Sequence, residues 1–237
     1  MSTYTITLTK KVVVANEVMA FHFTKPSGFT YIAGQYGDFT LINPPETDEE
    51  GDKRTFSFTS APCEPDLIIT TRLRDTAFKR TLKQLPIGSS VLLEGPFGSL
   101  ALPKNPAKTA VFLTGGIGAT LVRSMVVQAT YDQSPHTMVF FYSNQSPDRA
   151  VYLEEFTALA AQNKKLLFVP IMTDADRSWA GERGLINQAL LNKYLPAVTD
   201  SIYYLSGPGA MIGDMRRLLL SEGVDRTNIR SDQFVGY

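Results

Sequence analysis

The chain has 237 residues, of which 43% are hydrophobic, enough for a sizeable core in one large domain or two ordinary ones. Its 23 lysine and arginine residues balance 23 aspartate and glutamate residues, so the composition argues against nucleic acid as a partner. The single cysteine, Cys63, excludes an intrachain disulfide and any iron–sulfur cluster or zinc site that needs several cysteines of this chain.

The first residues do not have the pattern of a targeting segment. Residues 1–5 lack the basic and then apolar run of a secretory signal, and no stretch reaches the roughly 18 to 20 apolar residues of a membrane span. We therefore expect a cytoplasmic protein with no membrane span. The two histidines, His22 and His136, lie far apart without a partnering pattern, so no metal site is predicted.

The chain up to residue 103 is predicted to be a β-rich domain. Short apolar segments alternate with glycine and proline, a spacing typical of an antiparallel barrel. One helix is predicted at residues 77–85, because Pro86 and Gly88 follow it. The acidic residues 44–52 are predicted to be a solvated connection. The predicted strands cover residues 5–8, 12–14, 19–23, 36–41, 67–72 and 91–94.

The pattern changes at residues 103–106, where two prolines mark a predicted domain boundary. From residue 107 to 237, apolar runs alternate with helical segments, which is typical of a parallel sheet with helices on both faces. Strands are predicted at residues 109–114, 137–142, 166–171 and 201–205, and helices at residues 119–130, 150–162, 186–194 and 211–220.

A glycine-rich segment follows the first predicted strand of this second part. Gly115, Gly116 and Gly118 lie between a strand and a helix, where backbone N–H groups and the helix dipole can hold a pyrophosphate. The segment does not have the full spacing of the usual dehydrogenase fingerprint, and glycines after a strand can also form a plain tight turn. Both interpretations remain open on this segment alone.

Three further segments favour a nucleotide-binding interpretation of the glycine segment. Arg54-Thr55-Phe56-Ser57 lies in the β-rich part, Ser206-Gly207-Pro208 follows the last predicted strand, and Phe234-Val235-Gly236-Tyr237 ends the sequence. With the glycine segment, they make the chain resemble the ferredoxin–NADP reductase superfamily over nearly its full length. The resemblance implies an antiparallel Greek-key barrel that binds flavin in residues 1–103, followed by a parallel-sheet domain that binds NAD(P) in residues 107–237.

The resemblance also implies roles for individual residues. Arg54 would pair with flavin phosphate, Phe56 would pack beside the flavin, and the Ser57 hydroxyl would lie near flavin N5, which receives hydride. Phe234 would cover the flavin face and gate hydride transfer, although a terminal strand that packs on the sheet would also explain it. The other cofactor-binding residues implied are Thr55, Thr71, Arg72, Lys79, Arg80, Thr81, Gly115, Gly116, Ile117, Gly118, Ala119, Thr120, Ser206, Gly207, Pro208, Met211 and Tyr237.

The sequence departs from the family pattern at two of these positions. Many relatives have tyrosine at the position of Phe56, so one hydroxyl contact is missing here. Ser206 replaces a cysteine that lies near the nicotinamide in relatives. After the second predicted strand, residues 142–145 offer neither the acidic residue that would select NAD nor the basic one that would select NADP. The nucleotide is therefore written NAD(P)H.

Three functions follow as expectations. The first is a flavoprotein oxidoreductase that passes hydride from NAD(P)H to bound FAD, FMN being the second choice, and then electrons to a separate ferredoxin, flavodoxin, haem protein, iron–sulfur protein or small acceptor. The second is an NAD(P)H:flavin reductase for which flavin is a substrate. The third is a non-catalytic electron-transfer subunit of a larger complex.

Overall fold

The structure is a computed structural model that describes residues 2–233. It contains two compact units. The first comprises Met1–Ala101 and Arg123–Gln128, and the second comprises Leu102–Val122 and Ala129–Tyr237, within the described range. The predicted site residues Phe234 and Tyr237 lie outside the described residues.

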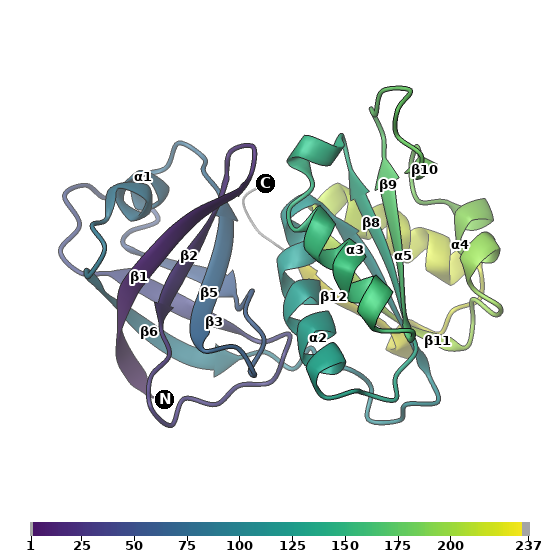
Figure 1. The fold of residues 1–237 in the computed structure, drawn as a ribbon, viewed down its shortest axis with the longest axis horizontal. Helices are drawn as coiled ribbons and strands as arrows, with labels where there is room; N and C mark the ends of the chain where they lie inside the picture. Colours follow the sequence, from purple (N-terminus) through teal and green to yellow (C-terminus); the bar gives the residue numbers. More distant parts are fainter. Residues whose placement is uncertain (1, 234–237) are drawn as a thin grey trace. The chain divides into compact units, whose positions relative to one another are not determined.

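The first unit is built on six antiparallel strands. Their order is β4-β3-β6-β1-β2-β5, and Figure 1 shows the sheet curving around the interior of this unit. Beyond the end of β4, the backbone N–H of Thr59 donates to the carbonyl of Ile68 on β5 at 2.8 Å, so the two edges of the sheet meet in a barrel-like closure. The strands are β1 (Thr3–Ala15), β2 (Val18–Thr24), β3 (Tyr36–Leu41), β4 (Lys53–Ser57), β5 (Asp66–Arg72) and β6 (Ser90–Phe97).

Alternation of apolar and polar residues explains why these strands form. Every second residue of β3 is buried, and so are Ile6 and Leu8 of β1. The two segments predicted at residues 5–8 and 12–14 are one continuous strand, with an irregularity in its pairing between Leu8 and Lys10. The barrel interior is rich in aromatic rings: Phe21, Phe23, Phe29, Tyr31, Phe39, Phe58 and Phe78.

Helix α1 (Ala77–Gln84) packs against the barrel core. Its buried residues Ala77, Phe78, Thr81 and Leu82 recur at helical spacing, which explains why this segment is a helix inside a β-rich unit. The side chain of Thr76 caps its first turn by accepting from the backbone N–H of Lys79 at 3.3 Å.

The second unit is a parallel sheet of six strands in the order β10-β9-β8-β7-β11-β12. The predicted strands and helices are found with shifts of a few residues at their ends. The short β10 and the edge strand β12 were not predicted. The elements are β7 (Thr109–Gly115), α2 (Ala119–Tyr131), β8 (Met138–Asn144), α3 (Leu153–Gln162), β9 (Leu166–Met172), β10 (Glu182–Arg183), α4 (Gln188–Tyr194), β11 (Ser201–Gly207), α5 (Gly209–Ser221) and β12 (Ile229–Gln233).

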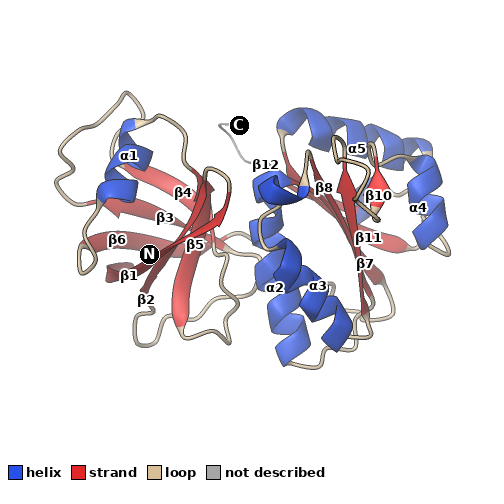
Figure 2. Ribbon diagram, turned by 45° about the horizontal axis from the view of Figure 1, so that its top comes forward, coloured by secondary structure: helices blue, strands red, loops and turns tan. Residues whose placement is uncertain are grey.

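Both faces of this sheet are covered by helices, with α2 and α3 on one face and α4 and α5 on the other (Figure 2). On the α3 face, Phe140 packs edge-on against Phe156 with ring centroids 4.9 Å apart. On the opposite face, the core includes Phe141 and Val169 from the sheet, Leu191 from α4 and Leu219 from α5. Because both faces are buried, the strands are apolar throughout rather than alternating, as the sequence indicated.

The predicted fold class is confirmed: an antiparallel Greek-key barrel followed by an α/β unit with a parallel sheet. Within residues 2–233, no helix has the length and apolar character needed to cross a membrane.

Candidate functional site

The glycine-rich segment lies at the carboxyl ends of the central strands of the second unit. Gly115 ends β7, a 3₁₀ turn covers Gly116–Gly118, and α2 begins at Ala119. Ser206 and Gly207 end the neighbouring strand β11. In open α/β sheets, ligands bind in this position, beyond the carboxyl ends of the strands.

Close backbone contact between the two strand ends explains the glycines. A Cβ atom on Gly118 would overlap the carbonyl oxygen of Ser206, and one on Gly207 would lie 3.0 Å from the backbone nitrogen of Gly115. Gly207 also has a φ of +150°, which side chains disfavour. By contrast, a Cβ on Gly116 would meet no atom within 4 Å, although its φ is +54°. The loops therefore pack tightly against each other while Gly116 faces open space.

Buried polar atoms without partners gather at the same edge of the sheet. The hydroxyls of Thr114 and Ser206 and the amide nitrogen of Asn144 have no hydrogen-bond partner among the described residues. Thr114 and Ser206 are paired across β7 and β11, and Asn144 ends β8, next to β7. Unpartnered buried polar atoms are rare in proteins, and a ligand that carries donors and acceptors is one way to satisfy them.

Of the other residues implied here, Ile117 and Thr120 are buried, and Ala119 starts α2. Pro208 precedes α5, and a Cβ on Gly115 would lie 2.6 Å from the sulfur of Met211, so Met211 also packs onto the glycine segment. The structure thus brings together all the residues implied for the pyridine nucleotide.

In the first unit, β4 and the start of α1 lie side by side. The rings of Phe56 and Phe78 are 5.8 Å apart, and the Arg54 guanidinium lies over the Phe78 ring at 5.3 Å from its centroid. The segment from Arg54 to Ser57 and the first turn of α1 were predicted from separate motifs. The structure places them in contact.

Arg54 and Arg80 are both paired with the acidic segment at residues 44–52. Asp48 accepts from Arg54 at 2.8 Å and from the backbone N–H of Ala77 at 3.1 Å. Glu46 forms a two-pronged pair with Arg80, at 2.9 and 2.5 Å, and Glu50 lies 3.0 Å from Arg54. The segment is a partly exposed connection between β3 and β4, as predicted, and its carboxylates Glu46, Asp48 and Glu50 also form ion pairs.

These pairs are reflected in the pKa values of the carboxyl groups. Hydrogen bonds from Arg80 lower the pKa of Glu46 below its usual value. Partial burial would raise the pKa of Asp48, but the hydrogen bond and charge of Arg54, with the amides of Ala77 and Glu50, outweigh burial and lower it. Both carboxylates are ionised at neutral pH.

The remaining flavin candidates surround this cluster. Burial, with the nearby charges of Arg74, Arg54 and Arg72, lowers the pKa of Lys79 to about 8. The Nε of Arg72 and the hydroxyl of Thr81 are buried and have no hydrogen-bond partner among the described residues. A ligand with donors and acceptors is one way to satisfy these atoms, as at the edge of the second sheet.

The last three candidates lie on β4 and β5. Ser57 and Thr71 are each 5% exposed, so little of either residue reaches the surface of the barrel. Thr71 donates to the carbonyl of Arg72 at 3.3 Å. Thr55 is exposed and donates to Asp38 on β3 at 2.5 Å, which gives it a partner within the sheet.

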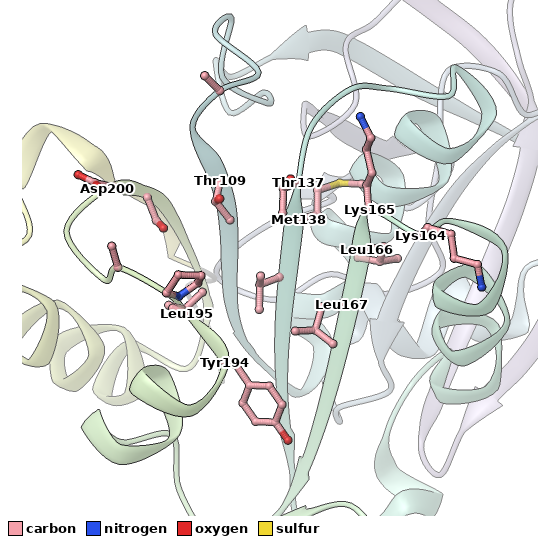
Figure 3. Close-up of a pocket in the computed structure, with 15 residues that line it drawn as sticks. Thr109, Thr137, Met138, Lys164, Lys165, Leu166, Leu167, Tyr194, Leu195 and Asp200 are labelled. Carbon is pink, nitrogen blue, oxygen red and sulfur yellow. The ribbon is translucent and has the colours of Figure 1, made fainter.

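A separate pocket of about 530 Å³ lies in the second unit, at the amino ends of β7, β8, β9 and β11. Its lining is largely apolar and includes Leu167, Tyr194 and Leu195 (Figure 3). The amine of Lys165 points away from Leu167 and donates to the carbonyl of Pro135 at 3.0 Å. This pocket is at the opposite edge of the sheet from the glycine loops and contains none of the predicted site residues.

Comparison with known proteins agrees with this arrangement. Residues 112–217 match a family model described as an oxidoreductase NAD-binding domain. This match covers most of the second unit, which carries the glycine-rich segment. Together with the barrel that precedes it, the fold is that of ferredoxin–NADP reductase-like proteins.

Two solved structures share this fold. The flavohaem-like FAD/NAD-binding domain of a nitric oxide dioxygenase from Vibrio cholerae has a TM-score of 0.83 at 21% identity, covering 97% of this chain and 98% of its own. A ferredoxin NADP⁺ reductase from Neisseria gonorrhoeae, with bound FAD and NADP, has a TM-score of 0.80 at 20% identity, covering 98% of both chains.

Curated relatives are longer than this chain. A subunit of the Na⁺-translocating NADH-quinone reductase from Methylococcus capsulatus is 36% identical over 155 residues, 63% of this chain and 38% of the relative. Its counterpart from Serratia proteamaculans is 28% identical over 220 residues, 86% of this chain and 54% of the relative. The chain thus spans between about a third and about a half of the length of these relatives.

Sequence reasoning missed Asp48, Glu46 and Asn144. A signal was present for the first two, since an acidic run directly before Arg54 in the sequence supplies counter-charges for nearby arginines. No comparable signal marks Asn144, whose significance depends on the missing partner of its amide nitrogen.

Proposed function

We propose that this chain is an NAD(P)H-dependent flavoprotein oxidoreductase, with FAD bound by the first unit and NAD(P)H by the second. When bound, flavin supplies the hydride and electron transfer that amino-acid side chains do not provide. The observation that carries the proposal is the tight packing of Gly118 and Gly207 at the carboxyl ends of β7 and β11, inside the segment that matches the NAD-binding family.

In the second unit, the chain's own residues would bind and orient the nucleotide. Backbone N–H groups at Gly116–Gly118 and the start of α2 would face the pyrophosphate, with the positive end of the helix dipole behind them. The unpartnered hydroxyls of Thr114 and Ser206 and the amide of Asn144 would meet polar groups of the nucleotide. The choice between NADH and NADPH stays open in this proposal.

In the first unit, Arg54, Lys79 and Arg80 would provide positive charge for flavin phosphate, as the resemblance implies. Phe56 would offer an aromatic face, and the Ser57 hydroxyl would hydrogen-bond the ring system and fix its orientation. Arg72 and Thr81, whose buried atoms lack partners, would complete the polar contacts.

The electron acceptor would be a separate component. A chain with one cysteine cannot hold an iron–sulfur cluster with cysteine ligands alone, so a ferredoxin, flavodoxin, haem protein or other iron–sulfur protein, or a small molecule, would receive the electrons. We place this reaction in the cytoplasm.

One observation favours the second function, an NAD(P)H:flavin reductase. Arg54 and Arg80 already pair with carboxylates of residues 44–52, so flavin phosphate would have to compete for them. Competition of this kind would weaken flavin binding and suit a flavin that is exchanged as a substrate.

Another observation favours the third function, an electron-transfer subunit. The curated relatives are subunits of Na⁺-translocating NADH-quinone reductases, and each is longer than this chain. In that role, the chain would bind flavin and nucleotide but turn over only together with the other subunits of the complex.

An absorption spectrum of the purified protein, followed by anaerobic NADH and then NADPH, tests the proposal. A yellow protein that is bleached by either nucleotide supports a flavoprotein oxidoreductase. A colourless protein that oxidises NAD(P)H only with added flavin indicates the flavin reductase. Tight flavin without turnover with any artificial acceptor indicates the electron-transfer subunit, and absence of flavin binding contradicts all three.

A further inference from the structure

The acidic segment at residues 44–52, which joins β3 to β4, makes contacts that a phosphate group would make. One carboxylate oxygen of Asp48 accepts from a guanidinium, and the other accepts from Ala77 at the first position of α1. A guanidinium and a helix amino terminus are the two groups that most often hold anions in proteins. Asp48 thus takes the place of an anionic ligand.

Glu46 binds a second guanidinium, that of Arg80 on α1, which also pairs with Asp75 outside the loop. The two oxygens of Glu46 accept from Nε and a terminal nitrogen of Arg80. This two-pronged geometry is also the one by which arginine binds phosphate. Two of the three cations predicted to hold flavin phosphate are therefore engaged by carboxylates of a single loop.

The third cation is left without a counter-charge of its own. Lys79 forms no ion pair among the described residues, and burial together with the arginines around it lowers its pKa. Thr81, on the same face of α1 as Ala77, is 4% exposed, and its hydroxyl has no partner among the described residues. Lys79 therefore keeps its charge available on α1, and the Thr81 hydroxyl on the buried face of the same helix is unsatisfied, so the loop does not satisfy every polar group of this helix.

We propose that residues 44–52 are an intramolecular competitor for the phosphate groups of flavin, which bind only after Asp48 and Glu46 release Arg54, Arg80 and the first amide of α1. This inference rests on the proposed function, because it assumes that the first unit binds flavin. Since flavin phosphate replaces a carboxylate at each cation, the net free energy gained on binding is small. Only molecules with the loop open can bind, so the apparent affinity for flavin falls in proportion to the open fraction. The loop would therefore set how readily flavin is exchanged.

Neutral variants of the loop test the inference through flavin affinity, measured by fluorescence titration with FMN, FAD and riboflavin. Asp48→Asn and Glu46→Gln keep the side-chain shape, remove the charge and replace one acceptor oxygen with an NH2 donor. Each should bind FMN and FAD about fivefold more tightly than the wild type, the value of one exposed ion pair. Riboflavin has no phosphate, so its affinity should not change.

Glu49→Gln is the matched control, because it removes the same charge from the same loop at an exposed residue that forms no ion pair within residues 2–233. It should leave all three affinities unchanged. The inference would be overturned if all three variants bound FMN equally well, or if Asp48→Asn bound FMN more weakly than the wild type. The proposed function would stand in either case. Absence of binding for all three flavins in every protein would instead overturn the proposed function, and the inference with it.

Hydrogen exchange on the wild type provides a test that needs no variant. The backbone N–H of Glu50 donates to Asp48 at 3.1 Å, and that of Gly51 donates to the Asp48 carbonyl at 2.9 Å. Saturation with FMN should speed exchange of these amides, since the loop must open. Unchanged or slower exchange in the presence of FMN would contradict the competition.

Discussion

The carbonyl oxygen of Ser206 lies where a methyl group on Gly118 would have to be. Two strand ends of the second unit therefore approach as closely as backbones can, and the loop that results presents its N–H groups beyond the sheet. Any side chain at residue 118 would have to push these two strand ends apart.

Gly118→Ala should destabilise the second unit and abolish NAD(P)H binding. Overpacking of a tight site costs about 1 to 3 kcal/mol of unfolding free energy, and relief of the clash requires that the loop move. Thermal unfolding and a nucleotide-binding titration measure the two effects. The control is Gly213→Ala in α5, where the new Cβ would meet only the tip of Arg217 at 3.6 Å. A Gly118→Ala protein as stable as Gly213→Ala would contradict the packing argument.

Arg54→Ala should release flavin and leave the fold intact. The side chain interacts with Asp48, Glu50 and the Phe78 ring, so its loss frees the acidic loop but opens no cavity in the barrel core. Flavin content after gel filtration, with circular dichroism as the check on folding, measures the outcome. Arg217→Ala, on the exposed surface of α5, is the control. Unchanged flavin content in Arg54→Ala would show that Arg54 is not needed for flavin binding.

Ser57→Ala should keep flavin but slow its reduction by NAD(P)H. The hydroxyl is buried, and the change to alanine removes a single oxygen atom at the end of β4. Loss of one orienting hydrogen bond corresponds to a decrease of about tenfold in the rate of hydride transfer. Stopped-flow measurement of the anaerobic reductive step tests this. An unaltered rate would mean that Ser57 has only a structural role in the barrel.

Flavin phosphate binding should weaken as the pH rises above about 8. Burial and the neighbouring Arg74, Arg54 and Arg72 hold the pKa of Lys79 at about 8, with Glu50 opposing them. A bound phosphate favours the charged amine and raises this pKa, so the complex binds more protons than the free protein above pH 8. The dissociation constant for FMN should rise by up to about fivefold between pH 8 and 9.

The control for this pH dependence is Lys79→Met. The variant should bind FMN more weakly at pH 7, and its affinity should be nearly flat up to pH 9. Riboflavin, which lacks phosphate, should show no such dependence with either protein. A Lys79→Met protein that keeps the full pH dependence would assign the effect to another group.

Glu64→Gln should lower the unfolding free energy by about 3 kcal/mol at neutral pH. Both oxygens of Glu64 accept from the buried Arg123, at 2.8 and 2.9 Å, and residues 123–128 of α2 group with the first unit. The variant therefore removes the carboxylate charge that faces this guanidinium. Chemical denaturation, with the exposed Glu49→Gln as control, measures the change.

The loss should shrink in acid. Burial would raise the pKa of Glu64, but Arg123 outweighs it and lowers the pKa below the usual 4.5. The stabilisation is therefore fully present above pH 4.5 and is lost as the pH falls through the lowered value. A Glu64→Gln deficit that stays constant down to pH 3 would contradict this ion pair.

Much of the fold could be read from the sequence because its signals are local. Runs such as residues 109–114 are apolar throughout and predict a buried parallel strand, and Pro86 predicts the end of α1. The edge strands β10 and β12 escaped prediction, since two residues of β10 carry no periodicity and β12 depends on pairing with β11. Pairing of this kind is a tertiary property that propensity does not encode.

For the candidate site, the sequence indicated which residues belong together but not how they are occupied. Gly118 and Gly207 are 89 positions apart, and only the register of β7 beside β11 explains why both must be glycine. Likewise, an acidic run in a loop is usually solvated, and the distances from Asp48 to Arg54 and Ala77 were needed to recognise it as anchored.

Transfer of electrons from NAD(P)H to flavin is the activity on which the proposed function depends. To test it, the protein is first supplied with FAD and then titrated anaerobically with NADH or with NADPH. The flavin absorption near 450 nm is recorded at about equimolar nucleotide. We expect bleaching by at least one nucleotide, faster than that of free FAD under the same conditions. Flavin that is bound but stays oxidised with both nucleotides would contradict the proposed function.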